Sequence, residues 1–207
     1  KWIGTANGLA KYDGNNWTVF QPSNSEIPDN LIRSIDVDSQ GDVWVGTTTG
    51  IGRFDGTNWH HYTSNDSSYN SQILTSENIP AIAIDENDVA AIGTINGGLI
   101  YLTDSTFTLF DSWTTGLQDN TILCITHDSE GNRWMGTPGA GILAHFGDHT
   151  SDTWSWFNAW NSNNPSNSIN AIMTDQADNV IAGTQDAGVA IYLGGANWQN
   201  FNANNSN

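Results

Sequence analysis

A short apolar strand that ends in the dipeptide Gly-Thr recurs along this chain. It stands at five places, at steps of 42 to 47 residues, and its first residues are Trp2, Trp44, Ala91, Trp134 and Ile181. Apolar and polar residues that alternate over about four to eight positions indicate a half-buried β-strand. A strand that returns at such regular intervals predicts a repeat protein.

The same neighbours surround each copy of this strand. Three or four residues after the threonine, a glycine opens a second apolar strand. A turn such as Asp13-Gly14 then leads to a third strand that carries two aromatic residues, as at Trp17 and Phe20. Such dipeptides suit tight hairpins, because glycine accepts positive φ angles. Before every Gly-Thr strand except the first lies a further strand, clearest at Ile32–Asp38.

Four short strands joined by hairpins within about 45 residues are typical of a β-propeller blade. We therefore predict an all-β chain that forms a five-bladed β-propeller of four-stranded antiparallel blades, the first of which lacks its inner strand. A β-solenoid is the alternative, but its coils are shorter and lack hairpin turns. The single domain spans 1–207, with repeats at about 1–29, 30–78, 79–119, 120–167 and 168–207.

These repeats resemble those of the two-component regulator propeller family. The family pattern, Ile-x-x-Ile-x-x-Asp-x-x-Gly-x-x-Trp-x-Gly-Thr-x-x-Gly-Leu, stands nearly complete at Ile32 to Ile51, and the tryptophan is lost only at Ala91 and Ile181. The resemblance implies a propeller similar to the periplasmic sensor halves of bacterial regulators, many of them linked to carbohydrate sensing. It also implies similarity to secreted and cell-surface propellers, and it transfers no catalytic residues.

The charge of the chain narrows the choice of partners. Lys and Arg number 5 against 22 Asp and Glu, which gives a formal net charge of -17 at pH 7. We expect no nucleic-acid partner, because phosphate contacts need clustered Lys and Arg, and no attraction to an anionic membrane. No apolar run approaches the length of a membrane span, so no membrane insertion is expected. Acidity and scarce lysine favour an extracytoplasmic location: secreted, surface or periplasmic.

Two segments have residue types that could bind a metal ion. His145 and His149 stand beside Asp148 and Asp152, but His-x-x-x-His suits ligands on a helix, and this segment is predicted to be a β-turn. The segment 36–42 is rich in aspartate like a calcium loop, yet it lacks the terminal bidentate glutamate. Equivalent aspartates recur in other repeats, which favours capping of turns. We expect neither a metal ion nor another cofactor.

The sequence offers no recognisable catalytic set. Gly-x-Ser-x-Gly is absent, and no Ser/His/Asp set follows a strand-elbow pattern. We predict a non-catalytic protein. The alternative is a hydrolase or lyase in which two carboxylates meet across the propeller.

The loops that join the blades and the turns after Gly-Thr are expected to share one face of each blade. These loops carry aromatic residues outside the aromatic positions of the repeat, and the turns carry Asn and Asp. Aromatic rings beside such groups can stack on sugar rings while the polar groups bond hydroxyls. The alternative is that the rings simply cover the loops. The candidate ligand-binding residues are Tyr69, Trp113, Trp160, Asn7, Asn96 and Asp186.

The first repeat begins inside its second strand, so the strand that should pair with Trp2, Ile3, Gly4 and Thr5 is not encoded before them. The sequence could be part of a longer chain with more blades, the fold could tolerate a short blade, or a strand from another chain could fill the place. We assign these four residues to a strand-complementation edge.

Two functions follow from this edge and from the loops. The leading interpretation is an assembly or adhesion scaffold, whose partners are other protein chains, including copies of itself in a homopolymer. The alternative is a carbohydrate-binding or ligand-sensing propeller domain, whose partners are glycans. Sugar binding that depends on Trp113 or Trp160 would distinguish the second function from the first.

Overall fold

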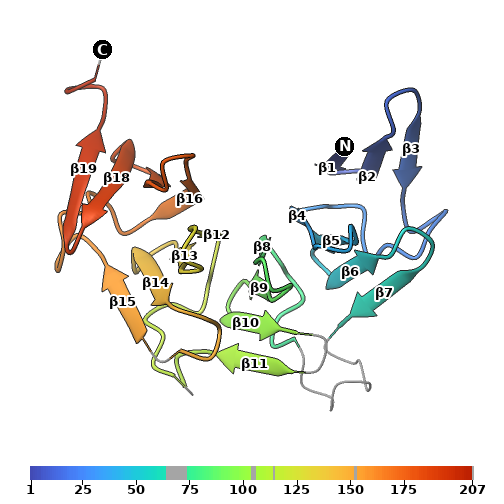
Figure 1. Cartoon of the computed structure of the whole chain (residues 1–207), viewed down its shortest axis with the longest axis horizontal. Coiled ribbons are helices and arrows are strands. Elements are labelled where there is room, and N and C mark those ends of the chain that lie inside the picture. Colours follow the sequence, from blue (N-terminus) through green and yellow to red (C-terminus); the bar gives the residue numbers. More distant parts are fainter. Residues whose placement is uncertain (64–73, 104–105, 114, 152, 207) are drawn as a thin grey trace. The chain divides into compact units, whose positions relative to one another are not determined.

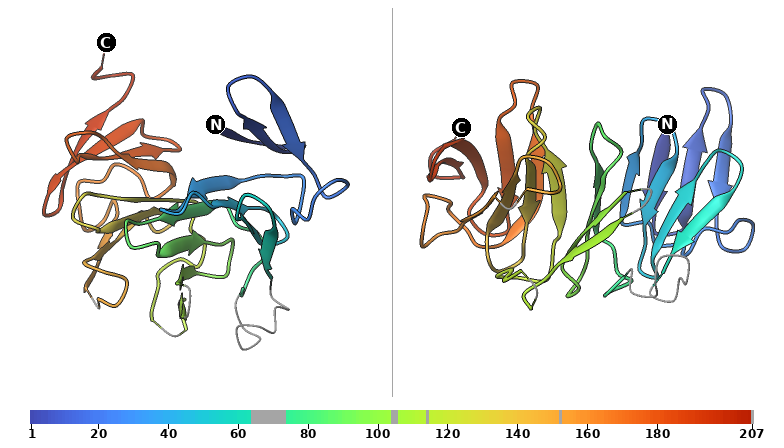
Figure 2. Two further views of the ribbon diagram at one scale, coloured as in Figure 1. Left: turned by 45° about the vertical axis from the view of Figure 1, so that its right-hand side comes forward. Right: turned by 60° about the horizontal axis from the view of Figure 1, so that its bottom comes forward.

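The computed structural model describes residues 1–63, 74–103, 106–113, 115–151 and 153–206. All regular elements within these ranges are β-strands (Figures 1 and 2). The chain divides into two compact units, Lys1–Phe110 and Asp111–Asn207, which we call the first and second units.

The first unit contains three antiparallel sheets, each with its strands in chain order or the reverse. Blade one is β1 (Trp2–Thr5), β2 (Gly8–Tyr12) and β3 (Trp17–Phe20). Blade two is β4 (Ser34–Val37), β5 (Val43–Gly46), β6 (Ile51–Phe54) and β7 (Trp59–Tyr62). Blade three is β8 (Ala81–Ile84), β9 (Ala90–Gly93), β10 (Leu99–Leu102) and β11 (Phe107–Phe110).

The second unit contains two four-stranded antiparallel sheets. Blade four is β12 (Cys124–His127), β13 (Arg133–Gly136), β14 (Ile142–Phe146) and β15 (Thr153–Phe157). Blade five is β16 (Ile169–Thr174), β17 (Val180–Thr184), β18 (Val189–Gly194) and β19 (Asn197–Phe201). The predicted all-β fold is confirmed: four sheets have four strands, and the first has three because it lacks the inner strand.

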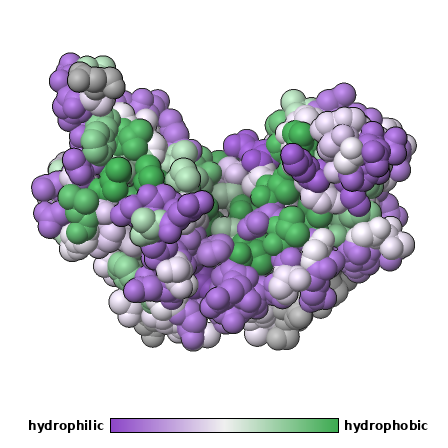
Figure 3. All heavy atoms as spheres, turned by 45° about the horizontal axis from the view of Figure 1, so that its top comes forward, coloured by the Kyte–Doolittle hydropathy of each residue, from purple (hydrophilic) through white to green (hydrophobic). Residues whose placement is uncertain are grey.

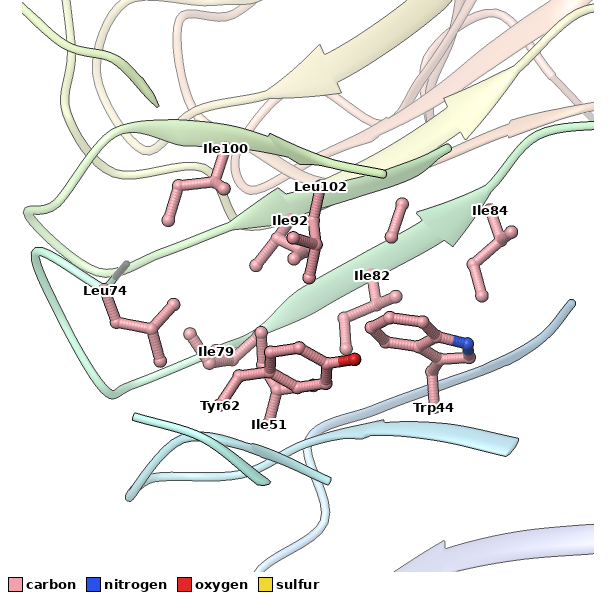
Figure 4. Close-up of a cluster of buried hydrophobic side chains, with 11 residues drawn as sticks. Trp44, Ile51, Tyr62, Leu74, Ile79, Ile82, Ile84, Ile92, Ile100 and Leu102 are labelled. Atoms are coloured by element: carbon pink, nitrogen blue, oxygen red, sulfur yellow. The ribbon is translucent and has the colours of Figure 1, made fainter. Parts of the chain in front are cut away.

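The tryptophan of the repeat packs between neighbouring blades, as its size and flat ring suggest. In the first unit, Trp44 of blade two stacks on Tyr62 with ring centroids 5.4 Å apart. Both rings lie against apolar residues of blade three, among them Ile82 and Ile92 (Figure 4). In the second unit, Trp134 of blade four belongs to a buried cluster that includes residues of blade five. Contact between successive apolar sheet faces thus forms the core of each unit.

The Gly-Thr dipeptide has two separate structural roles. Gly46 lies opposite Ser34 in the register of β4 and β5, and a Cβ there would lie 2.6 Å from the carbonyl oxygen of Ile79. Only glycine therefore fits where blades two and three approach each other. The hydroxyl of Thr47 donates to the carbonyl oxygen of Gly50 at 2.8 Å and so closes the turn to the next strand. The threonine bond recurs in every blade.

A Ser–Asp pair links blades two and three in the first unit, and another links blades four and five in the second. The backbone N–H of Ser39 donates to Asp88 at 2.8 Å, and the Ser39 hydroxyl donates to the other carboxylate oxygen at 2.6 Å. In the second unit Ser129 makes the same two bonds to Asp178, at 2.9 and 2.7 Å. Both aspartates have left-handed backbone conformations, with φ of 59° and 66°. Aspartate tolerates this region better than most residues, so the turn can direct its carboxylate at the preceding blade.

Candidate ligand-binding site

The turns after Gly-Thr are hydrogen-bonded to the loops that join the blades. Gly50 donates its N–H to the carbonyl oxygen of Glu77 at 2.8 Å, and Gly141 donates to that of Asn167 at 2.9 Å. The expectation that these turns and loops share one face is therefore confirmed within each unit. We call this the loop face.

Two tryptophans of the second unit project from the loop face. Trp113 is 92% exposed and Trp160 is 82% exposed. Their backbone N–H groups donate to the side chains of Asp111 and Asn158, at 2.9 and 3.0 Å. The two residues thus occupy equivalent positions, in the loops that follow β11 and β15. Other exposed apolar side chains include Trp17, Val19, Met173 and Leu193, and Figure 3 shows apolar patches within a largely hydrophilic surface.

The loop that carries Trp160 is firmly held. Asn161 accepts a bond from the N–H of Asn158 at 2.9 Å and donates its own amide to the carbonyl oxygen of Trp156 at 2.8 Å. The hydroxyl of Ser162 donates to the carbonyl oxygen of Asn158 at 2.8 Å. The indole is therefore presented by an ordered turn, which lowers the entropy lost when a ligand binds.

The remaining sequence-predicted ligand residues are also on the turns of the loop face. Asn7 is exposed, and its carbonyl and side-chain oxygens accept bonds from Gln21 at 2.9 and 3.1 Å. Asn96 is exposed, with φ of 64°. Asp186 is exposed in a turn that is bonded to the Trp160 loop through Gln185. Tyr69 lies outside the described residues.

The predicted complementation edge is open to solvent. β1 is the edge strand of blade one, and no other strand of the described part of the first unit pairs with it besides β2. Ile3 is 45% exposed, while Gly4 and Thr5 are also exposed. Trp2 is half-buried, and Lys11 lies 5.0 Å above its ring. The N–H of Ile32 donates to the carbonyl oxygen of Thr5 at 3.0 Å and so ties the end of β1 to blade two.

The two segments considered for metal binding have structural roles. Asp38 accepts bonds from the N–H of Asp42 at 2.9 Å and the indole of Trp44 at 3.0 Å, and it pairs with Arg53 at 3.1 Å. This confirms the interpretation as turn capping. His145 is buried and stacks on Trp154 with ring centroids 3.8 Å apart. Its Nε2 is bonded to the carbonyl oxygen of Ser151 at 2.7 Å. Asp152 lies outside the described residues.

The chain's one cysteine is unsuited to nucleophilic chemistry. Burial raises the pKa of the Cys124 thiol to about 12. The thiolate is the reactive form of cysteine, so Cys124 stays protonated at neutral pH. It lies opposite Gly136 in the register of β12 and β13, where a small side chain is needed.

One concave site was missed by the sequence reasoning. A groove of about 700 Å³ lies in the first unit and combines an indole, an imidazole and two carboxylates. Its residues come from four separate segments, so no motif marks it. Trp59 occupies an aromatic position of the repeat and His61 belongs to the adjacent His60-His61 pair, so the sequence gives both residues an unremarkable role. The lining residues are Pro22, Ser25, Glu26, Ile27, Pro28, Thr49, Trp59, His61, Thr63 and Glu77.

Comparison with known proteins supports the family resemblance. Residues 26–49 match the model of the two component regulator propeller family. The extracellular domain assigned to a hybrid two component system, BT3049 of B. thetaiotaomicron, is 27% identical and superposes with a TM-score of 0.75, over 93% of this chain and 26% of that chain. No curated protein sequence matches the chain.

Two further solved structures share the fold. PorZ, a surface component of the type-IX secretion system of Porphyromonas gingivalis, is 16% identical with a TM-score of 0.50, over 95% of this chain and 37% of that chain. Virginiamycin B lyase of Staphylococcus aureus, in a catalytically inactive form with quinupristin, is 15% identical with a TM-score of 0.72, over 97% of this chain and 65% of that chain.

The chain thus spans from about a quarter to about two thirds of the length of these proteins. Among the residues that the structure describes, no helix is long and apolar enough to cross a membrane. The repeats and the fold agree with the resemblance inferred from the sequence: the chain carries a two component regulator propeller repeat on a β-propeller fold shared with the extracellular domain of BT3049.

Proposed function

We propose that this chain is an extracytoplasmic, non-catalytic propeller domain that binds glycans on its loop face, in the manner of a sensor. The observation that carries the proposal is the pair of exposed indoles at equivalent loop positions, Trp113 and Trp160. Exposed apolar patches often mark binding surfaces, and an indole gives a flat surface for a sugar ring. Similarity to an extracellular domain of a two component system supports both the location and the sensing role.

Titration calorimetry with a panel of neutral oligosaccharides tests this proposal. We expect saturable binding that Trp160→Ala or Trp113→Ala weakens at least tenfold, about 1.4 kcal/mol. The melting temperature should hardly change, because both rings are exposed. The matched control is Trp17→Ala, which removes an indole that is 58% exposed on β3, outside the blade-joining loops. Saturable binding that survives both loop substitutions, or no binding to any sugar, would contradict the proposal.

The exposed edge of β1 favours a second function, in assembly. An exposed edge strand presents a row of unpaired N–H and C=O groups, which is a template for pairing with another strand. In this second proposal another protein chain, including a copy of the same chain, provides an inner strand beside Trp2–Thr5. The result would be a scaffold built by strand complementation.

A synthetic peptide that copies Leu31–Asp38, the inner-strand segment of blade two, tests this second function. We expect the peptide to bind the chain, to raise its melting temperature and to protect the amides of Trp2–Thr5 from hydrogen exchange. A ligand at 100 times its Kd stabilises the folded state by about 2.7 kcal/mol. The control is the same peptide in scrambled order. If neither protection nor stabilisation appears at millimolar peptide, β1 is not an acceptor strand.

A further inference from the structure

We propose that the groove lined by Trp59, His61, Glu26 and Glu77, which we call the Trp59 groove, is a second binding site, and that its ligand is a protonated amino sugar or a short oligomer of it. The groove lies entirely in the first unit, whereas Trp113 and Trp160 belong to the second. The groove is lined in part by loop-face segments of the first unit, namely 22–28, Thr49 and Glu77, and it is distinct from the tryptophan pair that carries the proposed function. Its volume of about 700 Å³ falls in the range of about 300–1,000 Å³ that is typical of ligand pockets.

Packing against neighbouring aromatic rings holds the indole of Trp59 in place. Its ring centroid lies 5.0 Å from that of Phe54 and 5.9 Å from that of Phe20. A Cβ on Gly52 would lie 3.0 Å from the Trp59 ring and 2.9 Å from the ring of Pro28. Both rings therefore approach the bare backbone of Gly52. Trp59 is only half-buried, so the rest of its surface is available to line the groove.

The segment 22–28 that forms another part of the groove is anchored at several points. Ile27 is 2% exposed and belongs to the core between blades one and two. The hydroxyl of Thr49 donates to the carbonyl oxygen of Pro28 at 3.1 Å. The imidazole Nε2 of His61 is hydrogen-bonded to the carbonyl oxygen of Glu26. The groove is thus preformed, and a ligand need not order this segment before it binds.

The charge of the groove selects the ligand. Glu26 and Glu77 contribute two carboxylates, and none of the described lining residues is lysine or arginine. The whole chain has a formal net charge of -17, which adds to the local negative potential. A protonated amine gains charge-assisted hydrogen bonds from such carboxylates, while an acidic glycan is repelled.

The combination of an indole with carboxylates favours a sugar ring that carries an ammonium group. The apolar face of a pyranose can lie on the Trp59 indole while its ammonium group reaches a carboxylate. A cation close to the face of an aromatic ring is attracted by the ring as well. A neutral sugar would keep only the ring contact, and a lysine side chain would keep only the charge.

Three probes of matched size separate these contributions: chitotetraose with free amines, its fully N-acetylated counterpart and tetralysine. We expect the free-amine sugar to bind at least tenfold more tightly than either of the others, and high salt to weaken it. Equal binding of the N-acetylated sugar would overturn the role of charge. Equal binding of tetralysine would overturn the choice of a sugar in favour of a basic peptide.

Glutamine substitutions locate the binding to the groove. Glu26→Gln and Glu77→Gln remove charge and keep the shape, and we expect each to weaken binding of the free-amine sugar at least fivefold. The control Glu86→Gln removes an exposed charge in the turn between β8 and β9, which does not line the groove. Loss of this affinity in Trp160→Ala, without loss in the two glutamine variants, would place the sugar at the loop tryptophans instead of the groove, so failure of the tryptophan-pair proposal and failure of the groove proposal are distinguishable. Loss of affinity in Glu86→Gln equal to that in the groove variants would refute the site.

Discussion

Blades one and two are built from the same repeat, but only blade two has an inner strand beside its Gly-Thr strand. Trp44 in β5 is 5% exposed and Val45 is fully buried. At the equivalent positions of β1, Trp2 is only half-buried and Ile3 is 45% exposed. The sequence of the Gly-Thr strand is thus not enough to bury it. In blade two, the strand is buried by the inner strand that pairs with it and by packing against the preceding blade.

The outer parts of the two blades do not differ in this way. In blade one, Asp13 accepts bonds from the N–H groups of Asn15 and Asn16, both at 2.8 Å. In blade two, Asp55 accepts the corresponding bonds at 2.7 and 2.6 Å. The outer hairpin therefore forms from local bonds, whereas the inner half of a blade depends on its neighbours.

Replacement of the repeat tryptophan should give the largest difference between blades one and two in the loss of unfolding free energy. Trp44→Ala removes a buried ring and its indole bond to Asp38, and we expect it to lower the free energy of unfolding by about 3–5 kcal/mol. Trp2→Ala should cost about 1–2 kcal/mol, because only part of its surface is buried. Denaturant unfolding followed by circular dichroism measures both values. Equal losses would mean that blade one is as well packed as blade two.

Replacement of the glycine of Gly-Thr should also destabilise the chain more in blade two than in blade one, but by a smaller margin. We expect Gly46→Ala to lower the free energy of unfolding by about 1–3 kcal/mol, since the added methyl meets the carbonyl oxygen of Ile79 at 2.6 Å. A Cβ on Gly4 would lie 2.7 Å from a side-chain methyl of Ile32. Because Gly4 is on the edge strand β1, which can move, Gly4→Ala should cost about 1 kcal/mol or less.

Gly183→Ala is the control for this pair of glycine variants. The nearest atom to a Cβ at this position is the Cβ of Ala171, at 3.6 Å, which is an ordinary contact. Its unfolding curve should match that of the unsubstituted chain. A loss in Gly4→Ala as large as that in Gly46→Ala would show that contact with the backbone carbonyl of Ile79 is not what makes this position of the repeat sensitive.

The outer hairpins should behave alike on acid titration. Backbone bonds from Asn58 and Thr57 lower the pKa of Asp55 to about 2, from an ordinary value of 3.8. Backbone bonds from Asn16 and Asn15 lower the pKa of Asp13 in the same direction. Because the folded pKa is the lower one, the stabilisation by each carboxylate is present above about pH 4 and is lost as the pH falls toward the folded pKa.

Carboxyl chemical shifts measured by NMR between pH 1.5 and about 6 give both pKa values. Asp13→Asn and Asp55→Asn keep an acceptor oxygen, so the hairpins should persist while the corresponding titration disappears. An ordinary pKa for Asp13 beside a low one for Asp55 would show that the missing inner strand also loosens the outer hairpin of blade one.

The regular part of the fold could be predicted because each repeat carries its own local signals. The threonine bond of Thr47, the turn capped by Asp38 and the packing of Trp44 between blades all act within one repeat or between adjacent ones, so the spacing reveals them. The position of Trp113 and Trp160 in blade-joining loops was also predictable, because both fall outside the aromatic positions of the repeat, and their role in ligand binding stays a prediction.

The Trp59 groove could not be predicted from the same signals. Its residues come from the segment after β3, the turn after β5, strand β7 and the segment before β8. Trp59 occupies an aromatic position of the repeat that is otherwise explained by packing. Whether its ring is covered depends on the path of the loop 22–28, and no pattern of apolar residues specifies that path.

The Ser–Asp pairs have a consequence for how the chain can fold during its synthesis. Ser39 and Asp88 are separated by 49 residues, and so are Ser129 and Asp178. At about 5–20 residues per second, a ribosome adds that length of chain within seconds. Blades two and four can therefore each be joined to the following blade as soon as that blade has left the ribosome. The sheet face of such a blade is then exposed only until the next 49 residues have been synthesised, which shortens the time in which it can aggregate.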